Sequence, residues 1–203
     1  MKTAEPESHL LKWTASEMAA KLRQREITSI ELVETHIDRI QQTHESLNAV
    51  VVPLFEQARR DAEAADKALS SNVDRGPLHG VPITIKELFD VAGTVTTAGI
   101  VSPHTRPAKS DAVTVAKLRA AGAVILGKTN VPQLGVAIES DNPVYGRTKN
   151  PLDLERSSGG SSGGESAVIA AFGSPLGLGS DGGGSIRVPS HFTGICGLKP
   201  TAG

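Results

Sequence analysis

Two glycine clusters, each carrying serines, flank an apolar segment between residues 154 and 190, and they constrain the fold more than any other part of the sequence. Glycine lets the backbone adopt positive φ and lets another group approach the main chain closely, at an entropic cost. Because Ser161 and Ser185 lie in these clusters, side chains cannot crowd their hydroxyls. The pattern indicates a nucleophile with backbone N–H groups directed at a developing oxyanion.

A flexible Gly/Ser linker is the alternative interpretation of the same clusters. The residues between them, SAVIAAFGSPLGLG, are apolar, which is typical of a helix and a strand in a core. The sequence therefore favours a folded site over a linker.

Composition excludes several classes of protein. The chain has 203 residues, enough for one domain with a substantial core, and 21 Lys and Arg against 22 Asp and Glu leave no global footprint for nucleic acid. Cys196 is the single cysteine, which excludes an internal disulfide and a multi-cysteine metal site and fits a reducing compartment. We find neither an apolar signal region at the N-terminus nor a membrane-spanning apolar run, so we expect a cytoplasmic protein without a membrane span.

The order of elements predicts an α/β fold. Thr14 with Glu17 and Thr28 with Glu31 fit the capping box, so each pair predicts the start of a helix. Apolar residues at helical spacing follow and are expected to face the core: Met18, Leu22, Ile30, Leu32, Val33, Ile37 and Ile40. Further elements are expected as helices over 55–69 and 112–121, strands over 47–52, 81–85 and 123–126, and a loop over 72–80. We expect one domain, with a helical region over about 1–70 and a catalytic core over about 77–203.

Three short motifs match known patterns, and the surrounding sequence argues against each. GAVILGKT at 122–129 fits the phosphate-loop pattern, but AVIL is typical of a strand rather than of a solvent-facing loop. Gly177, Gly179 and Gly182 fit a dinucleotide motif, but Pro189 is expected to interrupt the long helix that this motif needs. Residues 160–164 fit G-x-S-x-G, yet the acid and histidine that should follow Ser162 in order are not available.

A lysine is a better candidate than histidine for the base that activates a serine. The six histidines occupy polar or loop contexts, where we expect surface or hydrogen-bonded side chains: His9, His36, His44, His79, His104 and His191. Lys86 instead ends the β-branched run VPITIK, which predicts a strand entering a dry interior. Burial lowers the pKa of a lysine, so a neutral Lys86 could act as a general base. The alternative is a lysine that extends to solvent from the strand end.

Three segments together resemble the amidase signature family of serine hydrolases: GVPITIKELFDVAGTVTTAG, SDNPVYGRTKNPLDLERSSGGSSGGESA and LGLGSDGGGSIRVPSHFTGICGLKPTAG. The resemblance runs from about residue 77 to the C-terminus. It implies an α/β fold with a mixed β-sheet core flanked by helices, and a catalytic triad of Ser, cis-Ser and Lys. Matched by motif, Lys86 is the lysine, Ser161 is the cis-serine and Ser185 is the nucleophile.

The resemblance also implies a mechanism. Lys86 would take the proton of Ser161 as Ser161 takes that of Ser185, and the substrate, a small-molecule amide, would form an acyl-enzyme on Ser185. The implied oxyanion hole consists of the N–H groups of Gly182, Gly183, Gly184 and Ser185. Three further matching residues would hold the serines in place: Ser162, Asp181 and Arg187. No metal or organic cofactor is implied.

Two departures loosen the expected site: Ser158 stands where relatives commonly carry proline, and Gly182 replaces a bulkier residue. Relatives are also longer, so we expect this chain to be the N-terminal portion of a longer enzyme. Its fold would then be incomplete at the C-terminus, and its activity would be low or absent. An assay against a longer chain tests this expectation, and full turnover by the 203-residue chain would contradict it.

The resemblance leaves three functions open. They are an independent amidase, similar to stand-alone or fatty-acid-amide-hydrolase-like members, the glutaminase subunit of a glutamyl-tRNA amidotransferase, and an inactive truncated amidase. A homodimer is compatible with the sequence, which assigns neither the oligomeric state nor the amide substrate.

Overall fold

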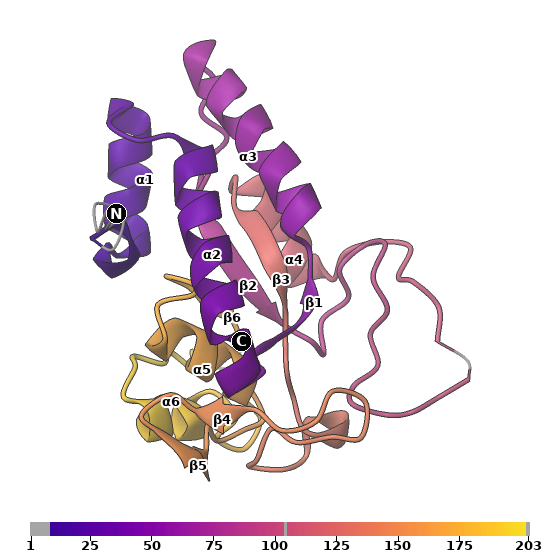
Figure 1. Ribbon diagram of the computed structural model, residues 1–203. Coiled ribbons are helices and arrows are strands. Elements are labelled where there is room, and N and C mark those ends of the chain that lie inside the picture. The colour runs from indigo at the N-terminus through magenta and orange to yellow at the C-terminus, as the bar shows by residue number, and fades with distance from the viewer. Residues whose placement is uncertain (1–8, 104, 202–203) are drawn as a thin grey trace.

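A mixed four-stranded sheet forms the centre of the computed structural model, which describes residues 9–103 and 105–201. The strand order is β1-β3-β2-β6, in which β2 runs parallel to β3 and β6 while β1 runs antiparallel to β3 (Figure 1). The bounds of these strands are β1 Val50–Pro53, β2 Pro82–Lys86, β3 Val124–Thr129 and β6 Gly177–Leu178. A separate antiparallel pair joins β4, Lys149–Asn150, to β5, Asp153–Ser157.

The two N-terminal helices begin where the capping boxes predict. Thr14 precedes α1, Ala15–Gln24, and Thr28 precedes α2, Ser29–Leu47, and each threonine accepts from the backbone of the glutamate three residues on. The predicted strand over 47–52 is wrong at its start, because α2 continues to Leu47. Asn48 then ends the helix in the left-handed conformation, and β1 begins only at Val50.

The remaining helices are α3 Phe55–Ser70, α4 Val113–Ala120, α5 Gly163–Ala170 and α6 Arg187–Thr193, with short 3₁₀ turns η1 Leu10–Lys12 and η2 Gln133–Gly135. Of these helices, α3, α4 and α5 agree with the predicted order, whereas α6 was not predicted. The long helix that the dinucleotide motif needs does not follow Gly182, because α6 begins at Arg187 and has seven residues. Pro189 belongs to this short helix. It lies in the first turn, where a helix has no internal acceptor for the N–H that proline lacks. Within the described residues, no helix is long and apolar enough to cross a membrane.

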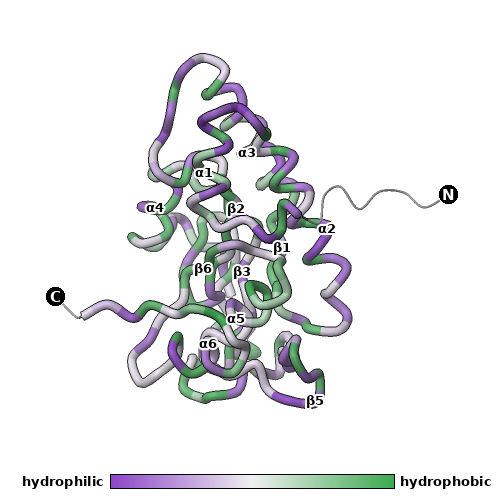
Figure 2. Tube along the Cα trace, turned by 90° about the vertical axis from the view of Figure 1, so that its left-hand side faces the viewer, coloured by the Kyte–Doolittle hydropathy of each residue, from purple (hydrophilic) through white to green (hydrophobic). Residues whose placement is uncertain are grey.

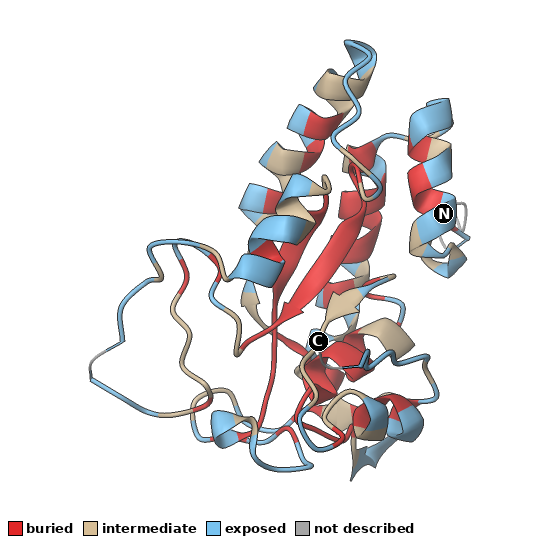
Figure 3. Cartoon of the chain, turned by 180° about the vertical axis from the view of Figure 1, so that it is seen from behind, coloured by how far each residue is buried: buried red, intermediate tan, exposed pale blue. Residues whose placement is uncertain are grey.

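The side chains of β2 divide between two environments. Ile83 and Ile85 belong to an apolar cluster with side chains of α1, α2 and α4, and side chains alternate along a strand. Thr84 and Lys86 therefore point to the opposite face, although the whole strand is buried (Figure 3). The sheet thus carries a lysine, with no exposed surface, at the carboxyl end of a buried strand.

The elements that follow β3 gather at one end of the molecule. Figure 1 shows α5 and α6 near β4 and β5, below α2. Figure 2 shows hydrophobic residues concentrated where the strands and α5 meet. The apolar side chains of Ala167 and Val168 on α5 pack in a second cluster with α2, α3, β1 and β3. This packing fixes the glycine clusters at either end of the α5–β6 unit against the sheet.

Candidate active site

Lys86 lies in a buried cluster of serine oxygens. Its Nζ is 2.6 Å from the Ser161 hydroxyl oxygen, 2.9 Å from the Ser180 hydroxyl oxygen and 3.4 Å from the Ser180 carbonyl oxygen. Burial lowers the pKa of Lys86 from its ordinary value to about 8, and the charges of Glu165 and Asp181 partly oppose that shift. The predicted strand-end lysine is therefore buried beside a serine and does not extend to solvent.

Ser161 is held by close backbone packing. It follows Gly160 through a cis peptide bond and is almost fully buried. A Cβ at Gly135 would lie 2.6 Å from the Leu88 side chain and 3.4 Å from the Ser161 hydroxyl oxygen. A Cβ at Gly160 would lie 2.9 Å from the carbonyl oxygen of Ala137. Glycines at both positions let the segment 135–138 pack directly against the Ser161 loop.

Ser185 lies beside the same loop, joined to it through the backbone. Its carbonyl oxygen accepts the Ser162 N–H at 3.0 Å. Among the described residues, no hydrogen bond joins the Ser185 hydroxyl to Ser161 or Lys86. The structure thus brings Lys86 and Ser161 into direct contact and joins Ser185 to the Ser161 loop through the backbone of Ser162.

Three of the four expected oxyanion donors have free N–H groups. Gly182, Gly183 and Ser185 donate no backbone hydrogen bond to any described residue, and a Cβ at Gly182 or Gly183 would meet no atom within 4 Å. Gly184 differs, because its N–H donates to the Asp181 carboxylate at 2.7 Å. The expected set is therefore reduced to three available donors around Ser185.

Asp181 organises the loop that carries Ser185. Besides Gly184, its carboxylate accepts the backbone N–H of Ile186 at 3.0 Å and of Arg187 at 3.2 Å. The Arg187 guanidinium donates to both of its oxygens, at 3.0 and 2.9 Å. These hydrogen bonds hold the pKa of Asp181 far below its usual range.

Ser162 joins the loop that carries Ser161 to the loop that carries Ser180. Its hydroxyl donates to the Ser180 carbonyl oxygen at 3.3 Å and lies 3.4 Å from the Ser180 nitrogen. These hydrogen bonds tie the two loops together, and the exclusion of Ser162 as an elbow nucleophile stays a prediction.

Sequence reasoning missed two residues next to Lys86. Ser180 contacts Nζ directly, and Glu165 lies buried on the first turn of α5 with its carboxylate accepting from Thr84 and Thr129. Burial raises the pKa of Glu165 to about 7. The available signal was a single charged residue within the apolar helix sequence GGESAVIA.

A second buried pair, Lys128 and Glu87, was also missed. The Lys128 Nζ lies 4.0 Å from the Glu87 carboxylate and donates to the Thr96 hydroxyl at 2.9 Å. Glu87 accepts the Thr97 and Ala98 N–H groups at 2.6 and 3.0 Å. The pair ties the segment after β2 to β3. The burial of Lys128 within β3 confirms that this part of the phosphate-loop match is a strand rather than a solvent-facing loop.

Two histidines are more buried than their sequence contexts indicate. His79 bonds the Arg75 N–H and the Ala65 carbonyl oxygen through its two ring nitrogens. His36 bonds the Leu32 carbonyl oxygen through Nδ1, while its buried Nε2 has no partner among the described residues. Desolvation lowers the pKa of His36 to about 4, so its ring is neutral near pH 7.

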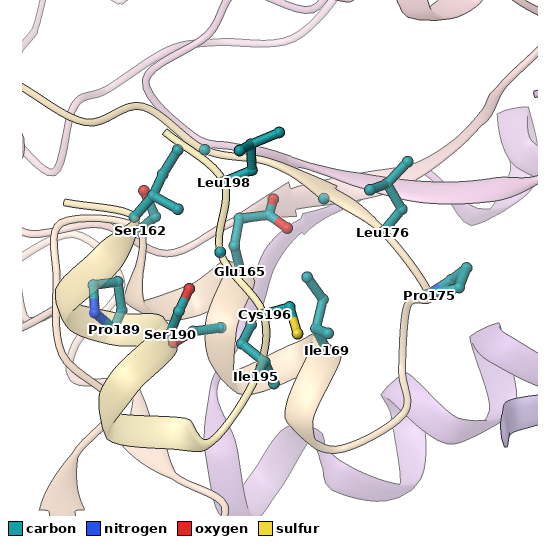
Figure 4. Close-up of a pocket in the computed structure, with 15 residues that line it drawn as sticks. Ser162, Glu165, Ile169, Pro175, Leu176, Pro189, Ser190, Ile195, Cys196 and Leu198 are labelled. Atoms are coloured by element: carbon teal, nitrogen blue, oxygen red, sulfur yellow. The ribbon is translucent and has the colours of Figure 1, made fainter. Parts of the chain in front are cut away.

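A cavity of about 310 Å³ opens beside the loops (Figure 4). Its apolar wall comes from α5, α6 and the segments 175–177 and 195–198, including Ile169, Leu176 and Ile195. Ser162 and Glu165 form a polar part of the lining. The cavity therefore reaches Ser162, which follows Ser161, and the carboxyl group of Glu165.

Comparison with known proteins gives consistent matches. The sequence model of the family Amidase matches residues 31–203. The chain is similar to fatty-acid amide hydrolase 2-A of Danio rerio, with 44% identity over 96% of this chain and 38% of that protein. It is also similar to a glutamyl-tRNA(Gln) amidotransferase subunit of Acidothermus cellulolyticus, with 42% identity over 97% of this chain and 39% of that protein.

A solved structure of a fatty acid amide hydrolase superposes with a TM-score of 0.91 at 34% identity, covering 94% of this chain and 34% of that chain. This match confirms the predicted amidase signature fold with its mixed sheet. The chain spans less than half the length of these relatives.

Proposed function

The chain belongs to the Amidase family, and from this premise we propose that it carries the catalytic residues of an amide hydrolase, with Lys86 as base, Ser161 as proton relay and Ser185 as nucleophile. One observation carries the proposal: the Lys86 Nζ lies 2.6 Å from the hydroxyl oxygen of Ser161 in a buried setting. A serine hydroxyl is a weak nucleophile and needs an adjacent base.

In the first step, neutral Lys86 accepts the proton of Ser161 while Ser161 accepts that of Ser185. The Ser185 oxygen attacks the amide carbon, so a C–O bond forms and the carbonyl electron pair moves onto oxygen. Because burial lowers the pKa of Lys86 to about 8, a useful fraction of the lysine is neutral near pH 7.

The developing oxyanion lies against backbone N–H groups of the Ser185 loop. The N–H groups of Gly182, Gly183 and Ser185 donate to none of the described residues, and open space at both glycines lets a substrate approach. Loss of one such donor typically costs about 3 kcal/mol of transition-state stabilisation. Asp181 and Arg187 keep the loop in this shape.

In the second step, the C–N bond breaks and the leaving amine receives the proton of Lys86 through Ser161. The acyl group remains on Ser185 as an ester. Water, deprotonated along the same route, then hydrolyses the ester and releases a carboxylate. The substrate class is a small-molecule amide.

A fluorophosphonate probe tests the nucleophile, because Ser185 would displace fluoride and form a stable phosphorus–oxygen bond. In protein extended to the length of the relatives, we expect labelling and amide hydrolysis in the wild type, loss of both in Ser185→Ala, and retention in Ser71→Ala, an exposed serine at the end of α3. Labelling that persists in Ser185→Ala would exclude this nucleophile. Absence of labelling in the folded wild type would favour the inactive alternative.

A second function is favoured by the 42% identity to a subunit of a glutamyl-tRNA(Gln) amidotransferase. In that case glutamine is the amide and the ammonia passes to a partner subunit. Hydrolysis of free glutamine, with copurification of a partner subunit, would support it. Hydrolysis of acyl amides without glutaminase activity would support the independent amidase.

A further inference from the structure

Glu165 is a buried carboxyl group that the proposed reaction does not use. Its side chain accepts the Thr84 hydroxyl at 2.6 Å and the Thr129 hydroxyl at 2.8 Å, and the residue is 4% exposed. A Cβ at position 177 would collide with this carboxylate, so Gly177 on β6 makes room for it. Burying an ionised carboxyl group costs free energy even when two hydroxyl groups donate to it. A charge kept at this cost suggests a functional role for Glu165.

The two threonines place Glu165 under Lys86. Thr84 lies two residues before Lys86 on β2 and therefore on the same face, and Thr129 on β3 is the register partner of Lys86. The carboxyl group is thus held by the two side chains that flank the lysine in the sheet. Each group acts on the other, because the Glu165 charge raises the pKa of Lys86 and the Lys86 charge lowers that of Glu165.

Other charged groups near the pair are already engaged. Asp181, on the loop after β6, also acts on Lys86, but Arg187 of α6 binds it. On α2, Arg39 donates to the Ala171 carbonyl oxygen at the far end of α5. On β3, Lys128 binds Thr96 near Glu87, and His191 of α6 is exposed.

We propose that Glu165 is a positioning residue that acts through Lys86 and sets the pH at which the lysine becomes a free base. This inference rests on the proposed role of Lys86. While Glu165 is ionised, it favours the ammonium form of Lys86. Without that charge the lysine loses its proton at a lower pH and is ready for the Ser161 hydroxyl. Glu165 also lines the cavity beside the site.

The test is Glu165→Gln, which keeps the shape but removes the negative charge. The amide oxygen can accept one threonine hydroxyl, and the amide N–H group can donate to the oxygen of the other. We expect the acid limb of kcat/KM against pH to move to lower pH by roughly one unit. Glu34→Gln is the matched control, because Glu34 pairs with Arg59 on the surface between α2 and α3, and it should leave the limb unmoved. A limb that stays in place in Glu165→Gln, or moves to higher pH, overturns the proposal.

A second measurement, an NMR titration of the wild-type protein, requires neither a folded variant nor catalytic activity. In wild-type protein carrying ¹³C-labelled lysine and glutamate, the Lys86 Cε signal should shift in two steps with pH. One of them should coincide with the step of the Glu165 carboxyl carbon. Independent single steps overturn the coupling. Hydrolysis that persists in Ser185→Ala would instead refute the proposed function while leaving the coupled titration intact, so the two failures are distinguishable.

Discussion

The Asp181 carboxylate accepts the N–H of Gly184 at 2.7 Å, so one of the four backbone donors expected for the oxyanion hole shapes the loop instead. The same carboxylate binds the N–H groups of Ile186 and Arg187. Ser185 lies between these anchored positions. The geometry of the proposed nucleophile therefore depends on one buried acid more than on the cluster of glycines around it.

Asp181→Ala should lower kcat/KM by about 10- to 100-fold, because the N–H groups of Gly184, Ile186 and Arg187 lose their shared acceptor and the loop loses its shape, at a cost of about 1–3 kcal/mol. Arg187→Ala should lower it less, since the arginine side chain is 58% exposed and the backbone donors to Asp181 remain. Arg156→Ala removes a comparable surface pair with Asp153 and is the control. Steady-state kinetics decide the order. A larger loss in Arg187→Ala than in Asp181→Ala would contradict this account.

Replacement of the base should be more severe. Lys86→Ala should reduce kcat by about 10²- to 10⁴-fold, the range typical of a general base. Lys67→Ala, at an exposed position of α3, should have wild-type rates. If both variants hydrolyse amides equally well, Lys86 is not the base.

Activity should rise with pH through about 8 in the wild type, because the reaction needs neutral Lys86 and burial lowers its pKa to about 8. Initial rates at subsaturating amide concentration, measured from pH 6 to 9.5, give the acid limb. A profile that is flat over this range would show that no group with a pKa near 8 controls the reaction.

Stability should depend on pH for the same reason. The folded-state pKa of Lys86, about 8, lies below the ordinary value of 10.5, so between these values the unfolded chain binds more protons. The free energy of unfolding therefore gains a contribution as pH rises from about 8 to 10.5, of about 3 kcal/mol in total. Urea denaturation of wild type and Lys86→Met across this window isolates the contribution in the difference between the two slopes. Parallel curves would contradict a lysine with a lowered pKa.

Local sequence signals predicted the helices and strands better than they predicted the contacts around the candidate site. The capping boxes at Thr14 and Thr28 and the β-branched run of β2 act within a few residues, so they placed helices and the strand correctly. The burial of Lys86 followed from the same run. The strand start at Val50 was missed, because the end of α2 depends on the left-handed conformation of Asn48.

The roles of Glu165 and Ser180 depend on contacts between distant segments. Glu165 meets Thr84 and Thr129 only because α5 packs on the sheet, and Ser180 reaches Lys86 because β6 pairs with β2. Neither contact leaves a pattern within a short window. The single-domain division, cytoplasmic location and homodimer stay predictions.

Glycine positions near the site differ sharply in what they tolerate. Gly164 donates its N–H to the Asn130 carbonyl oxygen, and a Cβ there would lie 2.7 Å from that oxygen and 2.9 Å from the Ala49 carbonyl oxygen. The atoms that this Cβ would meet belong to the backbone and cannot move without straining the sheet, so Gly164→Ala should destabilise the fold by about 1–3 kcal/mol. Gly182→Ala meets no atom within 4 Å and should stabilise it by about 0.5 kcal/mol, because alanine restricts the unfolded chain. Urea midpoints of the two variants, measured side by side, check the contrast. Equal midpoints would mean that α5 does not pack against the end of β3 as closely as described.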